Sequence, residues 1–172
     1  MRAIDAIHSA LAWGDRDIRF IEDMRSSPVA QPTPQCGAHA LWILGHFVIA
    51  EGRLRQIVLG EPHPAEHWKP LFDWASEPVA DVDAYPPFDE VLEMYRQLRA
   101  RNRQLLDEVG EAGLDHPTKN PPPGLEDGFK TIGQAFLTIA LHQVFHGGQA
   151  SIVRRASGRP PFFVPSEALR RS

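Results

Sequence analysis

One stretch of the sequence decides the fold: residues 131–156, TIGQAFLTIALHQVFHGGQASIVRRA. Thr131, followed three positions later by Gln134, is the capping-box pattern that begins helices, because each side chain can bond the other residue's backbone N–H. A largely apolar run follows, and Gly158 with Pro160 then ends the segment. The sequence therefore predicts a helix over residues 131–156.

A second helix is predicted over residues 34–58. Thr33 is a suitable N-cap, and Pro34 suits the first helical position, where its missing N–H costs nothing. Gly60 ends the segment. Residues 41–50 are apolar on more than one face of this helix, so we expect it to be heavily buried.

Two more helices are predicted, over residues 2–25 and 86–110, because each segment carries apolar residues at the three- and four-residue spacings of a bundle helix. Residues 59–86 hold five prolines and no sustained helical period, so they form a long crossover. Residues 111–130 form a second loop.

Loop lengths then predict the topology. The short link between the first two helices favours antiparallel neighbours, as does the link between the last two. Each helix is about 35 Å long, so the long crossover has enough chain to return and run the third helix parallel to the second. We expect one domain over residues 1–172, an all-α four-helix bundle that is up-down-down-up with a long crossover between helices two and three.

Composition excludes several classes of function. Apolar residues make up 42% of the chain and charged residues 23%, as in globular proteins, and the net charge is −4. The cluster Arg96, Arg99, Arg101 and Arg103 lies among acidic residues, so we interpret it as a solvated helix face. No basic face is left for a nucleic-acid partner.

Cysteine usage and hydropathy indicate a compartment. Cys36 is the only cysteine, which rules out an intrachain disulfide and fits a reducing cytoplasm. The N-terminus carries Asp5 and lacks the apolar run of a signal peptide. The longest apolar stretch, residues 41–50, is far shorter than the roughly 20 residues that span a bilayer. We expect a cytoplasmic protein with no membrane partner.

Three histidines are predicted to meet inside the bundle. His142 and His146 are four residues apart, so they project from one face of the last helix. His46 lies near the middle of helix two, and antiparallel packing of these helices would bring their midpoints to one height. Three neutral imidazoles would then hold a divalent metal with at least one position open. Separate core histidines, each bonded locally, are the alternative.

Other histidines receive simpler interpretations. His63 and His67 have the same spacing as the 142/146 pair, but flanking prolines make a helix there unfavourable, so we place both in a surface loop. His39 lies two turns before His46, about 10 Å away, and cannot share the ion. It is expected to be a polar residue near the helix start, with an access channel as the alternative.

The residues around these histidines resemble a known family. Leu44-Gly45-His46, with Glu51 five residues on, and the run HQVFHGGQ over residues 142–149 look like the two signatures of the DinB/YfiT-like superfamily. The order of segments and the long crossover fit as well. The resemblance implies that His46, His142 and His146 bind zinc or nickel. It also implies close helix packing at Gly148. Gln149 is expected either to bond a metal-binding histidine from behind or to have a structural role.

Two further groups of residues near the site are weighed separately. Glu51 lies about 140° around helix two from His46, so it should be a structural residue or lie at the mouth of the site. Trp68 and Trp74 are expected to anchor the crossover, although lining a pocket is the alternative.

The resemblance also implies a class of activity. Members of the superfamily include thiol-dependent S-transferases and an isomerase, so we expect a small-molecule ligand and a low-molecular-weight thiol cosubstrate. No acidic residue has the spacing of a general base beside the histidines. A metal-dependent hydrolase and a non-catalytic, stress-related or structural metal-binding bundle remain alternatives. Trp13 and Phe20, seven residues apart on helix one, could form an apolar patch that pairs in a homodimer, and the alternative is that both rings lie at the edge of the core.

Overall fold

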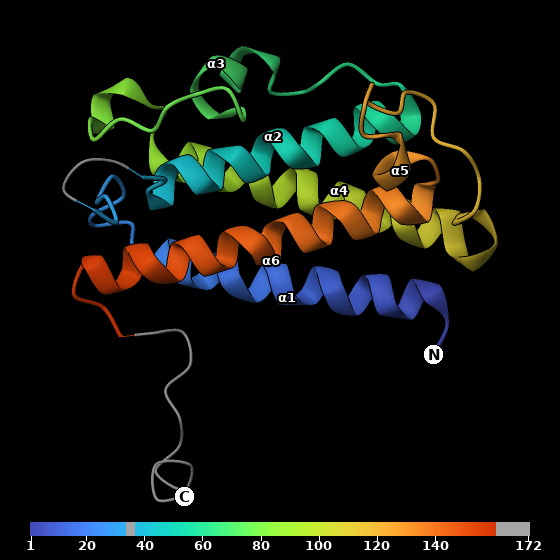
Figure 1. The fold of residues 1–172 in the computed structure, drawn as a ribbon, viewed down its shortest axis with the longest axis horizontal. Coiled ribbons are helices and arrows are strands. Elements are labelled where there is room, and N and C mark those ends of the chain that lie inside the picture. The colour runs from blue at the N-terminus through green and yellow to red at the C-terminus, as the bar shows by residue number, and fades with distance from the viewer. Residues whose placement is uncertain (34–36, 161–172) are drawn as a thin grey trace, which may run out of the picture.

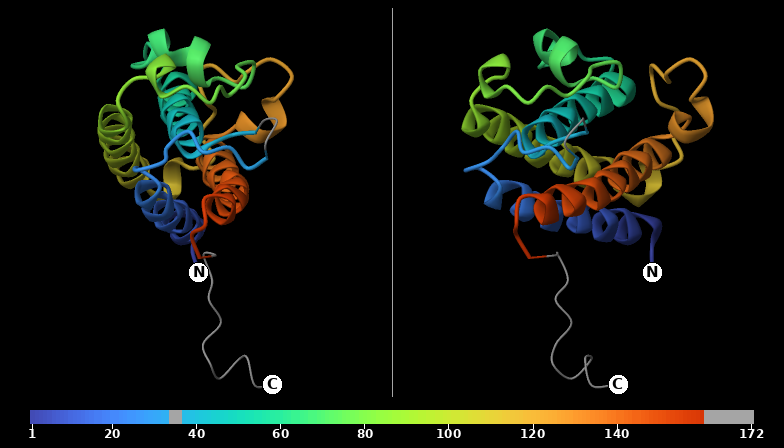
Figure 2. Two further views of the ribbon diagram at one scale, coloured as in Figure 1. Left: turned by 90° about the vertical axis from the view of Figure 1, so that its left-hand side faces the viewer. Right: turned by 60° about the vertical axis from the view of Figure 1, so that its left-hand side comes forward.

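A computed structural model, which describes residues 1–33 and 37–160, shows an all-α fold (Figure 1). Its long helices are α1 (Ala3–Asp23), α2 (Ala40–Leu59), α4 (Phe88–Gly113) and α6 (Ile132–Ala156). Four short helical segments occupy the two long connections: η1 (Glu66–Trp68), α3 (Lys69–Phe72), η2 (Val82–Ala84) and α5 (Glu126–Phe129). Seen end-on, the long helices surround a common interior (Figure 2, left).

Contacts between the long helices define their directions. The ends of α1 and α6 meet, since Arg154 bonds Asp23 at 2.6 Å. The end of α4 meets the start of α1, where the Glu111 carboxylate accepts the Ala3 N–H at 3.0 Å. Figure 1 shows α2 and α4 running from left to right and α1 and α6 from right to left. The crossover returns over the outer side of α2 to reach the start of α4.

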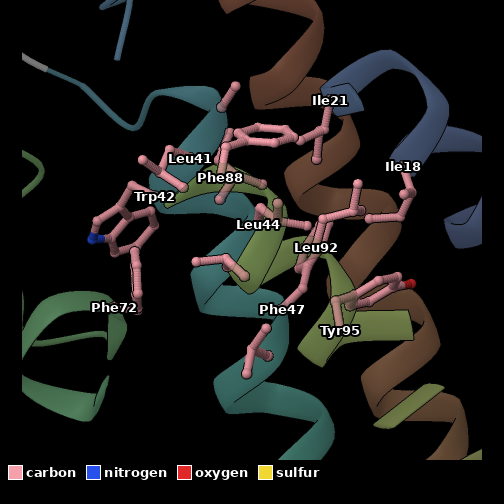
Figure 3. Packing of buried hydrophobic residues seen from close by; sticks show 14 of the residues in the cluster. Ile18, Ile21, Leu41, Trp42, Leu44, Phe47, Phe72, Phe88, Leu92 and Tyr95 are labelled. Atoms are coloured by element: carbon pink, nitrogen blue, oxygen red, sulfur yellow. The ribbon is translucent and has the colours of Figure 1, made fainter. Parts of the chain in front are cut away.

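The apolar core is centred on α2. Residues 41–50 are all buried, as the sequence predicted. Figure 3 shows Leu44 and Phe47 of α2 packed with Leu92 and Tyr95 of α4. Because α2 is surrounded by α1, α4, α6 and the crossover, any polar group on it has to find a partner inside the protein.

The start of α2 differs from the prediction. His39 is the N-cap, and its Nδ1 accepts the Trp42 N–H at 3.1 Å. Residues 37–39 are not helical, and residues 34–36 lie outside the described chain, so the predicted start at 34 with Thr33 as N-cap is wrong. The physical reason is Gly37, whose φ of 127° lies in a region that no helix allows.

The other helix boundaries follow local signals closely. The capping box of Thr131 and Gln134 is formed in both directions. Gly110, the predicted end of its helix, has a non-helical φ of 61°, and one more turn follows to Gly113. The crossover was expected to lack helical period, and its short helices were not located, because segments of three or four residues carry little periodic signal.

The arginine cluster is only partly solvated. Arg96 and Arg101 are exposed, but Arg99 is buried and pairs with Glu51 at 2.8 Å and Asp15 at 2.7 Å. Arg99 lies four residues after buried Tyr95, on the stripe of α4 that faces the core. The interpretation as a solvated face is therefore wrong for Arg99.

His63 also departs from expectation. It is buried, and its Nε2 bonds the carbonyl of Ile49 at 2.9 Å, while His67 is exposed. Its ring occupies the space that a side chain at Gly52 would need. The surface-loop prediction is wrong for His63, because the crossover packs down on α2. Within the described ranges, no helix is both long and apolar enough to cross a membrane.

Candidate metal centre

Helices α2 and α6 bring together the three histidines that the sequence singled out. Nε2 of His142 lies 3.0 Å from Nε2 of His46 and 3.0 Å from Nε2 of His146. One ligand nitrogen from each ring falls within 4.8 Å of the others. Two nitrogens bound to one ion at about 2.0–2.1 Å, with angles of about 90–110°, are about 2.8–3.4 Å apart. The two nitrogen pairs that include Nε2 of His142 therefore have the spacing that a divalent ion needs.

The outer nitrogens of two rings define their tautomers. His46 Nδ1 lies 2.7 Å from the Phe72 carbonyl oxygen, and His146 Nδ1 lies 2.7 Å from Gln149 Oε1. Both partners are acceptors, so each Nδ1 carries the proton and each Nε2 presents a lone pair to the centre. This is the arrangement of metal-binding histidines, whose second nitrogen donates to an oxygen.

His142 is the unsatisfied member of the cluster. Its Nδ1 is buried and has no hydrogen-bond partner among the described residues. Its Nε2 faces the Nε2 lone pairs of both His46 and His146. Without an ion, one N–H of His142 would have to donate to two acceptors. An ion that accepts three lone pairs satisfies the inner nitrogens together. The residues present therefore fit a divalent metal.

Burial keeps the three rings in the form that binds metal. It lowers the pKa of His142 to about 3 and that of His146 to about 4, and it also lowers the pKa of His46. All three are neutral at pH 7, so no proton competes with an ion there.

Aromatic rings hold the imidazoles in place. Trp42 stacks on His46 with ring centroids 4.8 Å apart and planes 10° from parallel. Phe47 and Phe145 meet the ring of His146 edge-on, at 5.9 and 5.2 Å. These contacts restrict the orientation of the imidazole rings.

The other side of the cluster opens into a pocket of about 520 Å³. Its lining comes from one face of α2, the start of α6, the crossover and the loop before α6: His46, Ile49, Ala50, Arg53, Trp74, Pro122, Pro123, Leu125, Phe129, Thr138, Ile139 and His142. Within the described residues, no fourth Cys, His, Asp or Glu joins the three histidines. A bound ion would therefore keep positions open toward the pocket.

The remaining predicted residues lie at different places. Gln149 lies behind His146, as described above. Glu51 is completely buried on the far side of α2, where it pairs with Arg99 and accepts from Gln143 at 3.0 Å. His39 caps α2 and bonds the Val79 carbonyl at 3.0 Å, and it is not part of the pocket wall.

Close helix packing occurs one residue earlier than the resemblance implied. A Cβ at Gly148 would meet nothing within 4 Å, whereas one at Gly147 would overlap the Asp17 carboxylate of α1. The expectation for Gly148 is therefore wrong. On α6, position 147 therefore faces α1, and position 148 faces outward.

Sequence reasoning missed several residues of the pocket. Trp68 is buried and anchors the crossover, as expected, whereas Trp74 is 69% exposed and lines the pocket, which was the alternative interpretation. Arg53 lies seven residues after His46, on the same face of α2, and this spacing is a signal that could have found it. The Phe72 carbonyl carries no sequence signal, because any residue has one.

Fold and site together define a helical-bundle protein with a histidine centre suited to a divalent metal. A sequence model of the DinB superfamily matches residues 20–150, a span that contains all three histidines. The chain therefore belongs to the DinB superfamily. No curated protein and no solved structure matches it.

Proposed function

We propose that this protein is a metal-dependent enzyme that holds one zinc or nickel ion on His46, His142 and His146. In this proposal it uses a low-molecular-weight thiol for S-transfer or isomerisation of a small molecule. The observation that supports it is the convergence of three Nε2 atoms at the wall of a pocket. When bound, such an ion lowers the pKa of a thiol or of water.

The open side of the site favours an enzyme over a structural metal. A structural ion is normally enclosed by four protein ligands. Here the described residues supply three, and the pocket adjoins two of them, His46 and His142. The chain itself would hold the ion, keep the three histidines neutral and surround the small molecule with apolar walls.

The lining of the pocket favours thiol chemistry over hydrolysis. Neither aspartate nor glutamate is among the residues that line it, so the lining offers no carboxylate base to activate water. A thiol held as thiolate is a nucleophile without such a base. We further propose a cytoplasmic location, where small thiols stay reduced, and a homodimer. Neither nucleic acid nor a membrane takes part.

The test begins with protein purified without a histidine tag. Elemental analysis should give close to one zinc or nickel ion per chain. After cobalt substitution, glutathione, bacillithiol or mycothiol should produce a sulfur-to-metal charge-transfer band.

The two parts of the proposal can fail separately. Protein that binds no divalent ion would contradict the metal site. A cobalt spectrum that none of the three thiols changes would contradict the thiol chemistry. An exchangeable water on the ion would then indicate a hydrolase, and its absence a structural or stress-related binding protein.

A further inference from the structure

The pocket beside the histidines is built on one face of α2. His46, Ile49, Ala50 and Arg53 occupy positions i, i+3, i+4 and i+7, so they line up along the helix axis. Arg53 is two turns from His46, about 10 Å away. The pocket thus has a histidine end and an arginine end, with apolar walls between them.

Among the described residues that line the pocket, Arg53 has the only side chain that is charged at pH 7. The rest of the lining consists of apolar residues, Thr138 and the two neutral histidines. Arg53 pairs with Asp73 at 2.7 Å, and its guanidinium carbon lies 5.2 Å from the centroid of the Trp74 ring. Asp73 itself is not part of the pocket wall. A ligand in the pocket therefore meets the cation and not its counter-ion.

The guanidinium is oriented and still has donors to offer. Arginine carries five N–H groups, and in the described chain Asp73 accepts a hydrogen bond from one nitrogen, Nη2. The Asp73 carboxylate is itself held by the Trp74 backbone N–H at 2.8 Å. Arg53 is thus fixed by an ion pair and a ring, which is how a carboxylate-binding arginine is preorganised.

We propose that the pocket binds a small organic carboxylate with an apolar body. Its carboxylate pairs with Arg53, its body lies against Ile49, Phe129 and Ile139, and its far end reaches the open side of the histidines. The rise of about 10 Å along α2 from His46 to Arg53 is close to the length of an extended octanoate. This deepens the proposed function and rests on it for the chemistry at the histidine end, whereas binding of the carboxylate itself needs no ion.

Calorimetry on the metal-free protein tests this with octanoate and 1-octanol, which share length and body but differ in charge. Octanoate should bind at least about tenfold more tightly, since a hydrogen bond to a charged group is worth about 1.5–3 kcal/mol. Arg53→Met should remove that preference and leave octanol binding unchanged. Leu125→Asp, at the partly exposed wall, should weaken both ligands.

The Asp73→Asn variant distinguishes two roles for Arg53: binding the ligand's carboxylate, or only forming a structural ion pair with Asp73. With its competing carboxylate removed, Arg53 should bind octanoate as tightly as before or a few-fold more tightly. If Arg53→Met and Asp73→Asn weaken octanoate alike, the pair is structural and the proposal is wrong. If Arg53→Met does not fold, Asp73→Asn and the octanoate-to-octanol ratio of the unmodified chain still decide.

Two other results would also overturn the proposal: equal affinity for octanoate and octanol, or no binding of either. Because the ion is absent throughout, these results are independent of the elemental analysis. Octanoate binding can succeed even if the protein binds no metal, and it can fail even if the protein does bind metal.

Discussion

At the scale of single residues, His142 is the member of the cluster on which an ion depends most. Its Nε2 is within 3.0 Å of the inner nitrogens of both other histidines, and its Nδ1 has no partner in the described part of the chain. His46 and His146 are each held by an oxygen behind the ring, so their position does not depend on the ion. The energy gained on metal binding should therefore be concentrated at His142.

His142→Ala should lose most of the bound metal. Loss of a residue behind a ligand typically costs about 10–100-fold in affinity, and loss of a ligand should cost more. Dialysis against a metal buffer followed by elemental analysis measures this. His67→Ala, which changes an exposed histidine of the crossover, is the matched control and should keep one ion per chain. Full metal content in His142→Ala would contradict the assignment.

His39 should make stability depend on pH. Burial lowers its pKa to about 4, whereas the unfolded chain titrates near 6.5. Between these values the unfolded state binds more protons, so stability is complete above pH 6.5 and falls as the pH drops toward 4. The slope from this group is at most about 1.4 kcal/mol per pH unit.

His39→Asn tests this, because asparagine can still cap α2 but does not titrate. Denaturant unfolding of the metal-free protein between pH 7.5 and 4.5 should show a shallower loss of stability in the variant. The other buried histidines, whose pKa values are also lowered, should maintain part of the slope in both proteins. An unchanged slope would show that His39 stays neutral in both states or titrates alike in both.

At the scale of elements, the crossover and α2 form one unit. The ring of Phe72 in α3 lies against Gly45, where a Cβ would overlap it, and the Phe72 carbonyl accepts from His46. The tight approach of α3 to α2 therefore orients a candidate metal ligand. Gly45 is needed for this contact and not for backbone flexibility, since it lies within a regular helix.

Two glycine-to-alanine changes should have opposite effects. Gly45→Ala should destabilise the protein by about 1–3 kcal/mol, as overpacking does, and should weaken metal binding by moving Phe72. Gly148→Ala faces open space in α6 and should stabilise by about 0.5–1 kcal/mol through helix propensity. Denaturant unfolding and metal titration measure both. Normal metal affinity in Gly45→Ala would contradict the prediction that the contact between the crossover and α2 orients a metal-binding histidine.

At the scale of the whole molecule, the exposed apolar surface gathers on α6. Between residues 132 and 153 this helix has no charged residue. Five of its exposed side chains are large and apolar: Leu137, Leu141, Val144, Phe145 and Ile152. On α1, Trp13 is exposed but lies under the guanidinium of Arg16, and Phe20 lies under that of Arg154. If the chain forms the predicted homodimer, the exposed face of α6 is a better candidate for its interface than α1.

If the dimer pairs through α6, one charged side chain introduced on this helix should dissociate it into monomers. Light scattering at micromolar concentration should give twice the chain mass for the unmodified protein and the monomer mass for Leu141→Glu. Val82→Glu changes a similarly exposed apolar residue of η2 and should leave the dimer intact. A monomeric unmodified chain would refute the homodimer, and a dimeric Leu141→Glu would place the interface elsewhere.

The sequence by itself determined what depends on residues a turn or two apart. The capping box at Thr131 and the break at Gly110 were correctly located, because caps and glycine act on adjacent backbone. The same is true of the shared face of His142 and His146. The expected antiparallel packing of the second and last predicted helices placed His46 beside that pair, and the family resemblance added Gln149.

Tertiary structure decided what depends on distant segments packing together. Arg99 belongs to a run of charged residues that is typical of a surface, but it lies on the inner face of α4 and pairs with Glu51 of α2, 48 residues earlier. His63 is buried because the crossover folds back on α2. The pocket needs Arg53, Trp74 and Phe129 from three segments, and its depth depends on how two loops cover α2 and α6. Such contacts are determined by the packing of the whole chain, and no local pattern encodes them.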